Sequence, residues 1–453
     1  METSSDRARL TPRRAVLLFL VVLVVHGLSP VVQVTDSRLS VPTAYAVLAH
    51  RTLALDGVPS VAPAVAQTDY DVVRRDGETL PFFPWPPMLL ALPGVALADV
   101  AGVDVPALRP SDPNQTYPIE VPTAALIVAA TAVLLALLVL ELTPAGPKTV
   151  RYSTGVALVF AFGTAAWSTA SRSLWQHTPA LLCAVLALLA ATRARRDPRY
   201  LWVLGAALAV GFTMRPTGAV PLIVLGAWSV VAFRREAWRV VAAGLAVAVP
   251  FVAVNLAAYG TVLTPYYAGT RLGNEVTIGF AESLLVHLVS PSRGLLVYTP
   301  MFLLVPAGLW IKRRAGELAS LDVAVTVVIV GHWLVIARYG STAGSSYGSR
   351  FFTEVVPYLL YLCLPVFQRA ALQRDLRRAA TVATAALVVA SIALTAPGAL
   401  TRSAFCWSAT PTFIDDAPER VWDWSDPQFF RPVRRLAAGA SPRNVLIGAC
   451  AVA

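Results

Sequence analysis

The chain has 453 residues, of which 56% are hydrophobic and 14% are charged, and its formal net charge is +11. Soluble domains carry about 25% charged residues, so this composition excludes an ordinary soluble domain and indicates a protein that lies in lipid. The basic excess does not indicate nucleic-acid binding, because many basic residues are gathered in short clusters between apolar segments.

Apolar segments about as long as a bilayer core recur from end to end. They predict an all-α, polytopic transmembrane bundle of about eleven helices, at residues 15–33, 121–142, 152–168, 177–192, 201–214, 217–233, 239–258, 294–311, 318–337, 351–367 and 379–397. The first resembles a signal peptide, but Ala44-Tyr45-Ala46 lies too far beyond it for cleavage, so an uncleaved anchor is predicted. Residues 1–397 are predicted to form the membrane domain and 398–453 a tail.

The clusters of basic residues predict the orientation of the bundle. They lie at Arg7–Arg14, Lys148–Arg151, Arg193–Arg199, Arg234–Arg239, Lys312–Arg314 and Arg369–Arg378. Cytoplasmic loops are enriched in such residues. All six clusters share one side only if the apolar segment 85–103 dips into the membrane without crossing it. Residues 34–120 are therefore predicted to be one long outer loop with membrane-surface helices, with a cytoplasmic N-terminus and an extracytoplasmic C-terminus.

Several polar motifs stand at the predicted outer boundaries of the spans. In chain order they are Thr35-Asp36-Ser37-Arg38, Thr68-Asp69-Tyr70-Asp71, Arg75-Asp76-Gly77-Glu78, Arg172-Ser173-Leu174-Trp175-Gln176-His177, Ser290-Pro291-Ser292-Arg293-Gly294 and Tyr347-Gly348-Ser349-Arg350. This order resembles the GT-C superfamily of polytopic membrane glycosyltransferases, in particular the protein O-mannosyltransferase and aminoarabinose transferase group. The resemblance extends over most of the chain.

The resemblance implies an inverting enzyme that takes a sugar from a polyprenyl-phosphate carrier. Its acceptor would be an envelope glycan, lipid or protein on the outer face of the plasma (inner) membrane. Two other classes stay open from the residues: a flippase or transporter of lipid-linked sugars, and an envelope enzyme of the O-antigen ligase or polymerase type. Nearly charge-free spans and one-sided polar loops favour the transferase over the transporter.

Asp36 is the candidate catalytic base, because it follows the first span directly, where a lipid-borne sugar would present its reactive carbon. A base accepts the proton of the attacking hydroxyl and contributes about 10²–10⁴-fold to the rate. The simpler alternative is that Asp36 caps the segment that follows, as Asp often does. Asp69, Asp71 and Glu78 are candidates for a second acid.

A lipid phosphate leaves in this reaction, so cations must meet its charge. Arg293 and Arg350, with Tyr347 beside the latter, are predicted phosphate ligands, and Arg172 and His177 are further candidates. Each arginine could instead anchor to lipid headgroups. Arg215, in a short link between spans, is either a turn residue or a charge inside the bundle.

Asp69-Tyr70-Asp71 offers oxygen ligands for Mg²⁺ or Mn²⁺, although a simple turn explains it equally well. Of the four cysteines, Cys183 and Cys363 fall in predicted spans. Cys406 and Cys450 lie in the tail, and the sequence leaves their pairing open.

Overall fold

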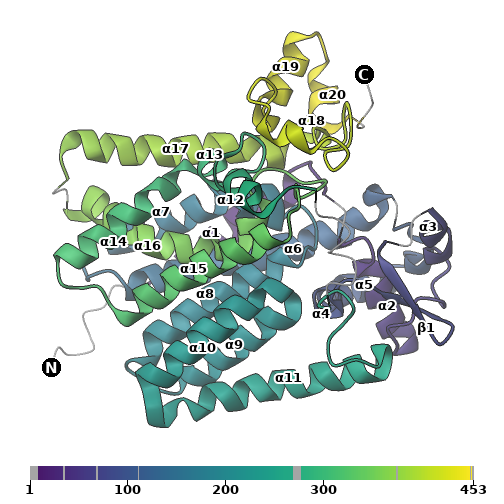
Figure 1. Cartoon of the computed structure of the whole chain (residues 1–453), viewed down its shortest axis with the longest axis horizontal. Helices are drawn as coiled ribbons and strands as arrows, with labels where there is room; N and C mark the ends of the chain where they lie inside the picture. The colour runs from purple at the N-terminus through teal and green to yellow at the C-terminus, as the bar shows by residue number, and fades with distance from the viewer. Residues whose placement is uncertain are drawn as a thin grey trace.

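The computed structural model describes residues 9–33, 36–67, 70–110, 112–268, 277–373, 376–448 and 450. It is an all-α bundle whose long helices run side by side across Figure 1, with the N-terminus at one end of the bundle. The predicted fold class is confirmed: helices dominate the described residues, and one two-stranded hairpin is the sheet among them.

Seven helical segments are long and apolar enough to cross a membrane. They contain α6 (Pro113–Glu141), α8 (His177–Ala194), α10 (Ala219–Phe233), α11 (Trp238–Tyr259), α15 (Ser320–Arg338), α16 (Val356–Gln368) and α17 (Arg378–Leu400). The first of them begins well before the predicted residue 121, because Pro113 starts the helix and Pro118 is accommodated inside it. Its 29 residues span about 43 Å, more than the hydrocarbon core of a bilayer.

The other four predicted spans coincide with shorter helices, so the number of crossings stays a prediction. Three of these are α1 (Pro12–Leu28), α7 (Thr149–Phe162) and α9 (Tyr200–Met214). The segment 294–311 is divided into α13 (Leu295–Tyr298), η7 (Pro300–Leu304) and α14 (Val305–Arg314), since Pro300 cannot continue a helix.

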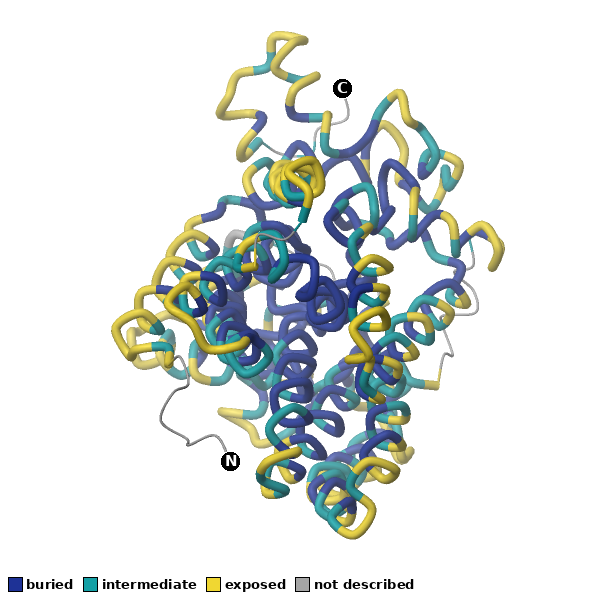
Figure 2. Tube along the Cα trace, turned by 90° about the vertical axis from the view of Figure 1, so that its left-hand side faces the viewer, coloured by how far each residue is buried: buried dark blue, intermediate teal, exposed yellow. Residues whose placement is uncertain are grey.

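Many residues of the outer helices are exposed, whereas residues in the interior of the bundle are buried (Figure 2). Val231, Leu245 and Val389 are all more than half exposed on α10, α11 and α17. α8 and α16 lie in the interior and are buried nearly all round. An exposed apolar surface of this extent is stable against lipid and not against water. The chain is therefore an integral membrane protein.

The first loop folds into a small layer at one end of the bundle (Figure 1). Its elements are α2 (Ser40–His50), α3 (Val61–Gln67), β1 (Val72–Arg75), β2 (Glu78–Pro81), α4 (Trp85–Met88), η1 (Leu89–Ala91), α5 (Leu92–Val100) and η2 (Val105–Ala107). The strands pair antiparallel, with Val72 opposite Pro81. Asp76 and Gly77, both at positive φ, form the turn, as Asp-Gly does in tight hairpins.

The aromatic residues that follow β2 are buried. Prolines surround Phe82 and Phe83 in the sequence, a pattern that indicates an exposed turn with its rings at the lipid headgroups, yet the two side chains are 1% and 2% exposed. Their rings pack against Tyr266, 5.6 and 5.1 Å away between centroids. This cluster joins the first loop to the segment that follows α11.

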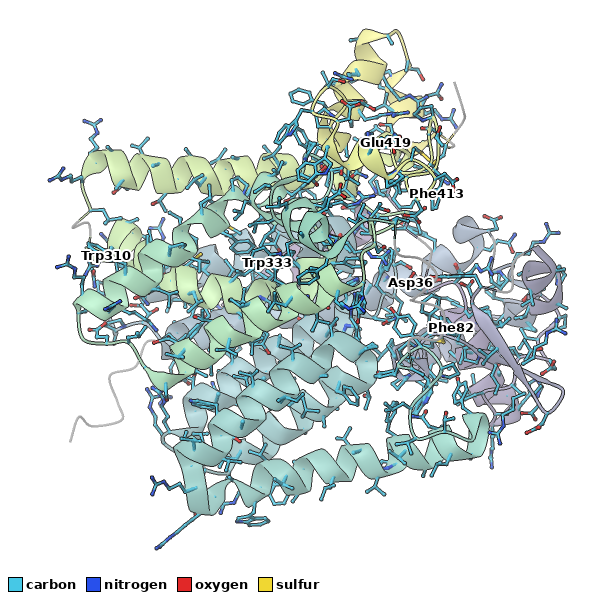
Figure 3. The ribbon with its side chains drawn as sticks, in the orientation of Figure 1. Asp36, Phe82, Trp310, Trp333, Phe413 and Glu419 are labelled. Carbon is cyan, nitrogen blue, oxygen red and sulfur yellow. A yellow bond between two sulfur atoms is a disulfide. The ribbon has the colours of Figure 1, made fainter. Side chains whose placement is uncertain are left out.

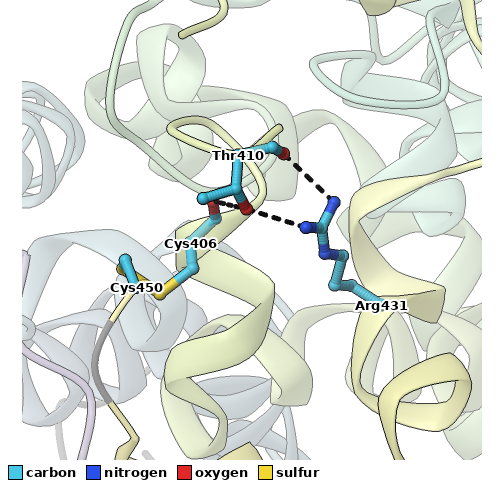
Figure 4. The surroundings of a disulfide bond; sticks show 4 residues. All are labelled: Cys406, Thr410, Arg431 and Cys450. Atoms are coloured by element: carbon cyan, nitrogen blue, oxygen red, sulfur yellow. Dashed lines mark hydrogen bonds between the residues drawn. A yellow bond between two sulfur atoms is a disulfide. The ribbon is translucent and has the colours of Figure 1, made fainter. Parts of the chain in front are cut away.

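The tail folds back onto loops from the same end of the bundle. It contains α18 (Arg402–Cys406), η10 (Pro418–Trp422), η11 (Gln428–Phe430), α19 (Arg431–Ala437) and α20 (Pro442–Ile447). Trp407, Ile414 and Val421 form a small core with Ile278 and with Val286 of α12 (Phe280–Val289). A disulfide joins Cys406 to Cys450 and closes the tail (Figure 4), which settles the pairing that the sequence leaves open.

Candidate active site

Asp36 and Arg350 form an ion pair at the end of the bundle that carries the first loop and the tail. Asp36 lies in the turn between α1 and α2, and Arg350 begins the short helix η8 (Arg350–Val355). Arg350 Nη2 lies 3.2 Å from Asp36 Oδ2, and the side chains are 10% and 13% exposed. Figure 3 places Asp36 at the edge of the bundle, facing the first loop. The second carboxylate oxygen of Asp36 has no hydrogen-bond partner among the described residues.

Arg350 keeps unused donors in this arrangement. Its buried Nε has no hydrogen-bond partner among the described residues, and Nη1 has none there either. The guanidinium lies over the ring of Trp175, with Cζ 4.5 Å from its centroid. A desolvated contact of this kind contributes about 2 kcal/mol. The guanidinium is thus held in place with two nitrogens available to an anion.

A second arginine is held beside this pair by a buried carboxylate. Glu354 Oε1 lies 2.9 Å from Arg215 Nε, and the other oxygen, Oε2, lies 2.8 Å from His177 Nδ1. Thr217 Oγ1 donates a 2.7 Å hydrogen bond to Glu354 Oε1. Among the described residues, Arg215 Nη2 has no partner. Glu354 therefore fixes Arg215 while leaving one of its nitrogens unused.

Two tyrosines complete the surroundings of the arginines. Tyr266 is close enough to interact electrostatically with Asp36, Arg215, Arg350 and Tyr339. Burial raises the pKa of both phenols, so each keeps its proton at neutral pH and can donate a hydrogen bond. The site thus combines two carboxylates, two guanidinium groups and two phenols.

Buried Glu120 braces the two segments that carry Asp36 and Trp175. Its Oε2 accepts a 2.6 Å hydrogen bond from Ser173 and a 3.3 Å bond from the backbone N–H of Leu174. Ser173 also shares a hydrogen bond with Ser37, the neighbour of Asp36 in the chain. Glu120 therefore contacts the segment of Trp175 directly and is linked to the segment of Asp36 through Ser173.

Arg293 is buried and its guanidinium is fully occupied inside the protein. It donates to the carbonyl oxygens of Thr342, Gly344 and Ser346 at 2.6, 2.8 and 3.1 Å, and it also bonds Gln428 and Ser408 of the tail. Burial lowers its pKa to about 10, so it stays charged at neutral pH. These hydrogen bonds do not favour the predicted phosphate contact. They indicate that Arg293 stabilises the loop that leads into Arg350.

Arg172 and Tyr347 have similar internal roles. Arg172 is fully buried and donates to the carbonyl oxygens of Ser29 and His26, at the end of α1. The hydroxyl of Tyr347 donates a 2.6 Å hydrogen bond to the carbonyl of Leu394. Of the five predicted phosphate ligands, Arg350 and His177 lie in the cluster around Asp36, where His177 contacts both Glu354 and Arg215.

Among the candidates for a second acid, Asp71 and Glu78 do not join this cluster. Asp71 lies 2.5 Å from Arg38 in an ion pair between β1 and the turn of Asp36. Glu78 is exposed at the start of β2, and Asp69 is outside the described residues. Within the described residues, no group of three or more His, Cys, Asp or Glu is placed to hold a metal ion. Mg²⁺ or Mn²⁺ dependence stays a prediction.

Glu354, Trp175, Tyr266 and Tyr339 were not singled out as site residues by the sequence. One signal pointed to Glu354: a carboxylate inside the predicted span 351–367 is costly unless a cation neutralises it. Glu354 lies one helical turn after Arg350. Its need for a neutralising cation would have indicated Arg215 as a partner. Tyr266 and Tyr339 gave no such signal, because each lies in a segment that connects helices.

An apolar groove of about 450 Å³ opens between α9, α10 and α11. Its lining includes Phe212 and Thr213 at the end of α9, just before Arg215 in the chain, and Val262 and Leu263, which precede Tyr266 and Tyr267. Tyr267 donates hydrogen bonds of 2.6 and 2.9 Å to the carbonyls of Phe212 and Thr213, which ties this end of the groove to the site.

A solved structure has a similar fold. The crystal structure of ArnT from Cupriavidus metallidurans bound to undecaprenyl phosphate superimposes with a TM-score of 0.50, over 96% of this chain and 90% of that chain, at 13% identity. The GT-C fold implied by the sequence resemblance is confirmed by this likeness. No protein-family model matches the chain, and no curated protein sequence matches it.

Proposed function

We propose that this protein is a membrane glycosyltransferase that moves a sugar from a polyprenyl-phosphate carrier to an acceptor hydroxyl, with inversion. One observation carries the proposal: Arg350 is held by Asp36 and Trp175 at 8% residue exposure, yet two of its guanidinium nitrogens have no partner within the described part of the chain. A buried cation with unused donors is suited to a phosphate.

The proposed reaction assigns a task to each group. The acceptor oxygen attacks the anomeric carbon, and its proton passes to the second oxygen of Asp36. The bond between that carbon and the phosphate oxygen breaks, and the electron pair leaves with the phosphate. Arg350 and Arg215, with the hydroxyls of Tyr266 and Tyr339, stabilise the added charge. One fixed donor of this kind contributes about 10²–10³ to the rate.

The apolar groove between α9, α10 and α11 supports a long-chain carrier. It is lined almost wholly by apolar atoms and ends at Thr213, two residues before Arg215. A prenyl chain in this groove would bring its phosphate to the arginines. The ArnT structure holds undecaprenyl phosphate, a carrier of this class, on the same fold.

Orientation in the plasma membrane belongs to the same proposal. Asp36, the first loop and the tail lie at one end of the bundle, opposite Trp310 and the basic cluster Lys312–Arg314 (Figure 3). The positive-inside rule assigns that basic end to the cytoplasm. The disulfide of the tail supports the extracytoplasmic assignment of the site, because disulfides persist in oxidising compartments. The acceptor is then an envelope glycan, lipid or protein.

The test is sugar transfer by the purified full-length protein, with polyprenyl-phosphate sugars as donors and cell-envelope extract as acceptor. Asp36→Asn should lower turnover at least 100-fold, as loss of a general base does, while thermal unfolding changes little. Asp104→Asn removes an exposed acid of the same loop and should leave turnover unchanged. Full turnover of Asp36→Asn would refute the role of Asp36, and no transfer by the wild type with any carrier-linked sugar would refute the function.

A further inference from the structure

Two grooves flank α7 at the end of the bundle opposite Asp36. One of about 660 Å³ lies between α7, η9 (Arg369–Gln373) and α17, and one of about 400 Å³ lies between α1 and α7. Both are lined mainly by apolar side chains, and neither is lined by an acid. No part of the proposed reaction uses them.

The larger groove is a wedge created by the angle between α7 and α17. At the inner end of the wedge the helices touch: a Cβ placed on Gly163 would lie 3.3 Å from Ile392. Toward the start of α7 the walls of the groove pass from Val159 and Val388 to Gly155 and Thr384. The groove therefore extends from this contact to Lys148 and Arg151 at the start of α7.

The two grooves share a charged mouth. Arg151 lines both of them, Lys148 adds to the larger and Arg14 to the smaller. All three side chains are exposed, and none of them has an acidic partner among the described residues. Lys148 also caps the N-terminus of the 14-residue helix α7, where the helix dipole favours an anion.

Gly155 joins the grooves on either side of α7. It lines both, and a Cβ placed on it would meet no atom within 4 Å. We propose that one anionic phospholipid of the leaflet opposite Asp36 is bound here, with its phosphate at Arg14, Lys148 and Arg151 and one acyl chain in each groove.

Two observations favour a phospholipid over the proposed sugar carrier. Two grooves that meet at one mouth suit a lipid with two chains, whereas a polyprenyl phosphate has one. The mouth also lies at the start of α1 and Asp36 lies beyond its end, and the 17 residues of this helix span about 25 Å. A carrier with its sugar at Asp36 cannot place its phosphate here. The inference does not depend on the proposed reaction.

Native mass spectrometry of the purified full-length protein tests the site. Dioleoyl phosphatidylglycerol and dioleoyl phosphatidylcholine are titrated separately. The wild type should bind phosphatidylglycerol more tightly. Each basic side chain near an anionic lipid contributes about fivefold in binding, so Arg14→Gln/Lys148→Gln/Arg151→Gln should lose about 100-fold for phosphatidylglycerol and little for phosphatidylcholine.

Gly155→Leu is the second variant, because its Cβ would meet no atom within 4 Å, its side chain would take up groove volume, and leucine is a strong helix former. It should weaken the binding of both lipids. Gly27→Leu is the matched control: this helical glycine also meets no atom within 4 Å, lines neither groove, and its change should leave lipid binding intact. Equal affinity of the wild type for both lipids, an unchanged triple variant, or displacement of phosphatidylglycerol by equimolar undecaprenyl phosphate would overturn the assignment.

Discussion

Two arginines at the same end of the bundle differ in what their guanidinium groups bind. Arg293 donates to carbonyl oxygens and side chains on both the 342–346 loop and the tail, so its hydrogen bonds are all made within the protein. Arg350 has one acidic partner and unused donors. The first arrangement stabilises a fold, and the second leaves binding capacity for a ligand.

This difference predicts opposite results for two substitutions. Arg293→Ala leaves several buried acceptors unpaired and should lower the free energy of unfolding by about 3–5 kcal/mol. Arg350→Gln should cost less stability and lower transfer at least 100-fold, as loss of a fixed donor does. Thermal unfolding in detergent and turnover, measured on both variants, separate the two roles. An inactive Arg293→Ala protein of wild-type stability would contradict this assignment.

The pair of Glu354 and Arg215 supports a double-substitution test. Glu354→Gln leaves the buried Arg215 without its counter-charge and should destabilise the protein by about 3–5 kcal/mol. Glu354→Gln combined with Arg215→Met removes both charges and should recover most of this loss. Transfer should stay low in the double variant, because Arg215 is assigned to the phosphate. Recovery of transfer together with stability would exclude Arg215 from the site.

At the scale of elements, the tail is closed by its disulfide. The bond spans 44 residues and encloses most of the tail. A cross-link over a loop of this length stabilises by about 4 kcal/mol in the chain-entropy model. Around it, Arg431 bonds the carbonyl and hydroxyl of Thr410 (Figure 4), which ties α19 to the loop after α18.

Cys406→Ser should therefore expose the tail to proteases while the helical bundle stays resistant. Limited proteolysis followed by mass analysis would show cleavage after residue 401 in the variant and little in the wild type. Mild reduction should make the wild type behave like the variant and leave the variant unchanged. Equal resistance of both proteins would show that tail packing alone, through Trp407 and Val421, holds this unit.

Elements were predicted from the sequence better than the contacts between them. Each predicted span coincides with helical structure, because uninterrupted apolar runs have few alternatives in lipid. The division of 294–311 into α13, η7 and α14 was not predicted, although Pro300 and Pro306 indicate it. The burial of Phe82 and Phe83 depends on Tyr266, more than 180 residues later in the chain, and no local pattern contains that information.

The site shows the same limit. Asp36 and Arg350 were identified singly, since each stands at a predicted outer boundary of a span. Their pairing across 314 positions could not be predicted, nor could the difference between Arg350 and Arg293. Both arginines follow a serine at such a boundary, and the contrast in their bonding arises from which loops fold over them.

At the scale of the whole molecule, the two ends of the bundle differ in charge and in polar structure. One end carries Asp36, the first loop and the tail, and the other carries basic clusters such as Lys312–Arg314 (Figure 3). Cytoplasmic loops are enriched in Lys and Arg, so the basic end is predicted to face the cytoplasm. On this prediction, every group assigned to the reaction would lie on the outer face.

Cysteine labelling tests this orientation in intact cells. The four native cysteines should not react with the reagent, because Cys183 and Cys363 are buried and Cys406 is bonded to Cys450. Arg109→Cys, at an exposed position of the first loop, should react with an impermeant thiol reagent from outside. Arg313→Cys, also exposed, should react only after lysis. The reverse pattern would mean that 85–103 crosses the membrane or that the whole protein is inverted. Labelling of both in intact cells would mean that one of the predicted spans between residues 109 and 313 does not cross, which would divide the loops of the proposed site between two compartments.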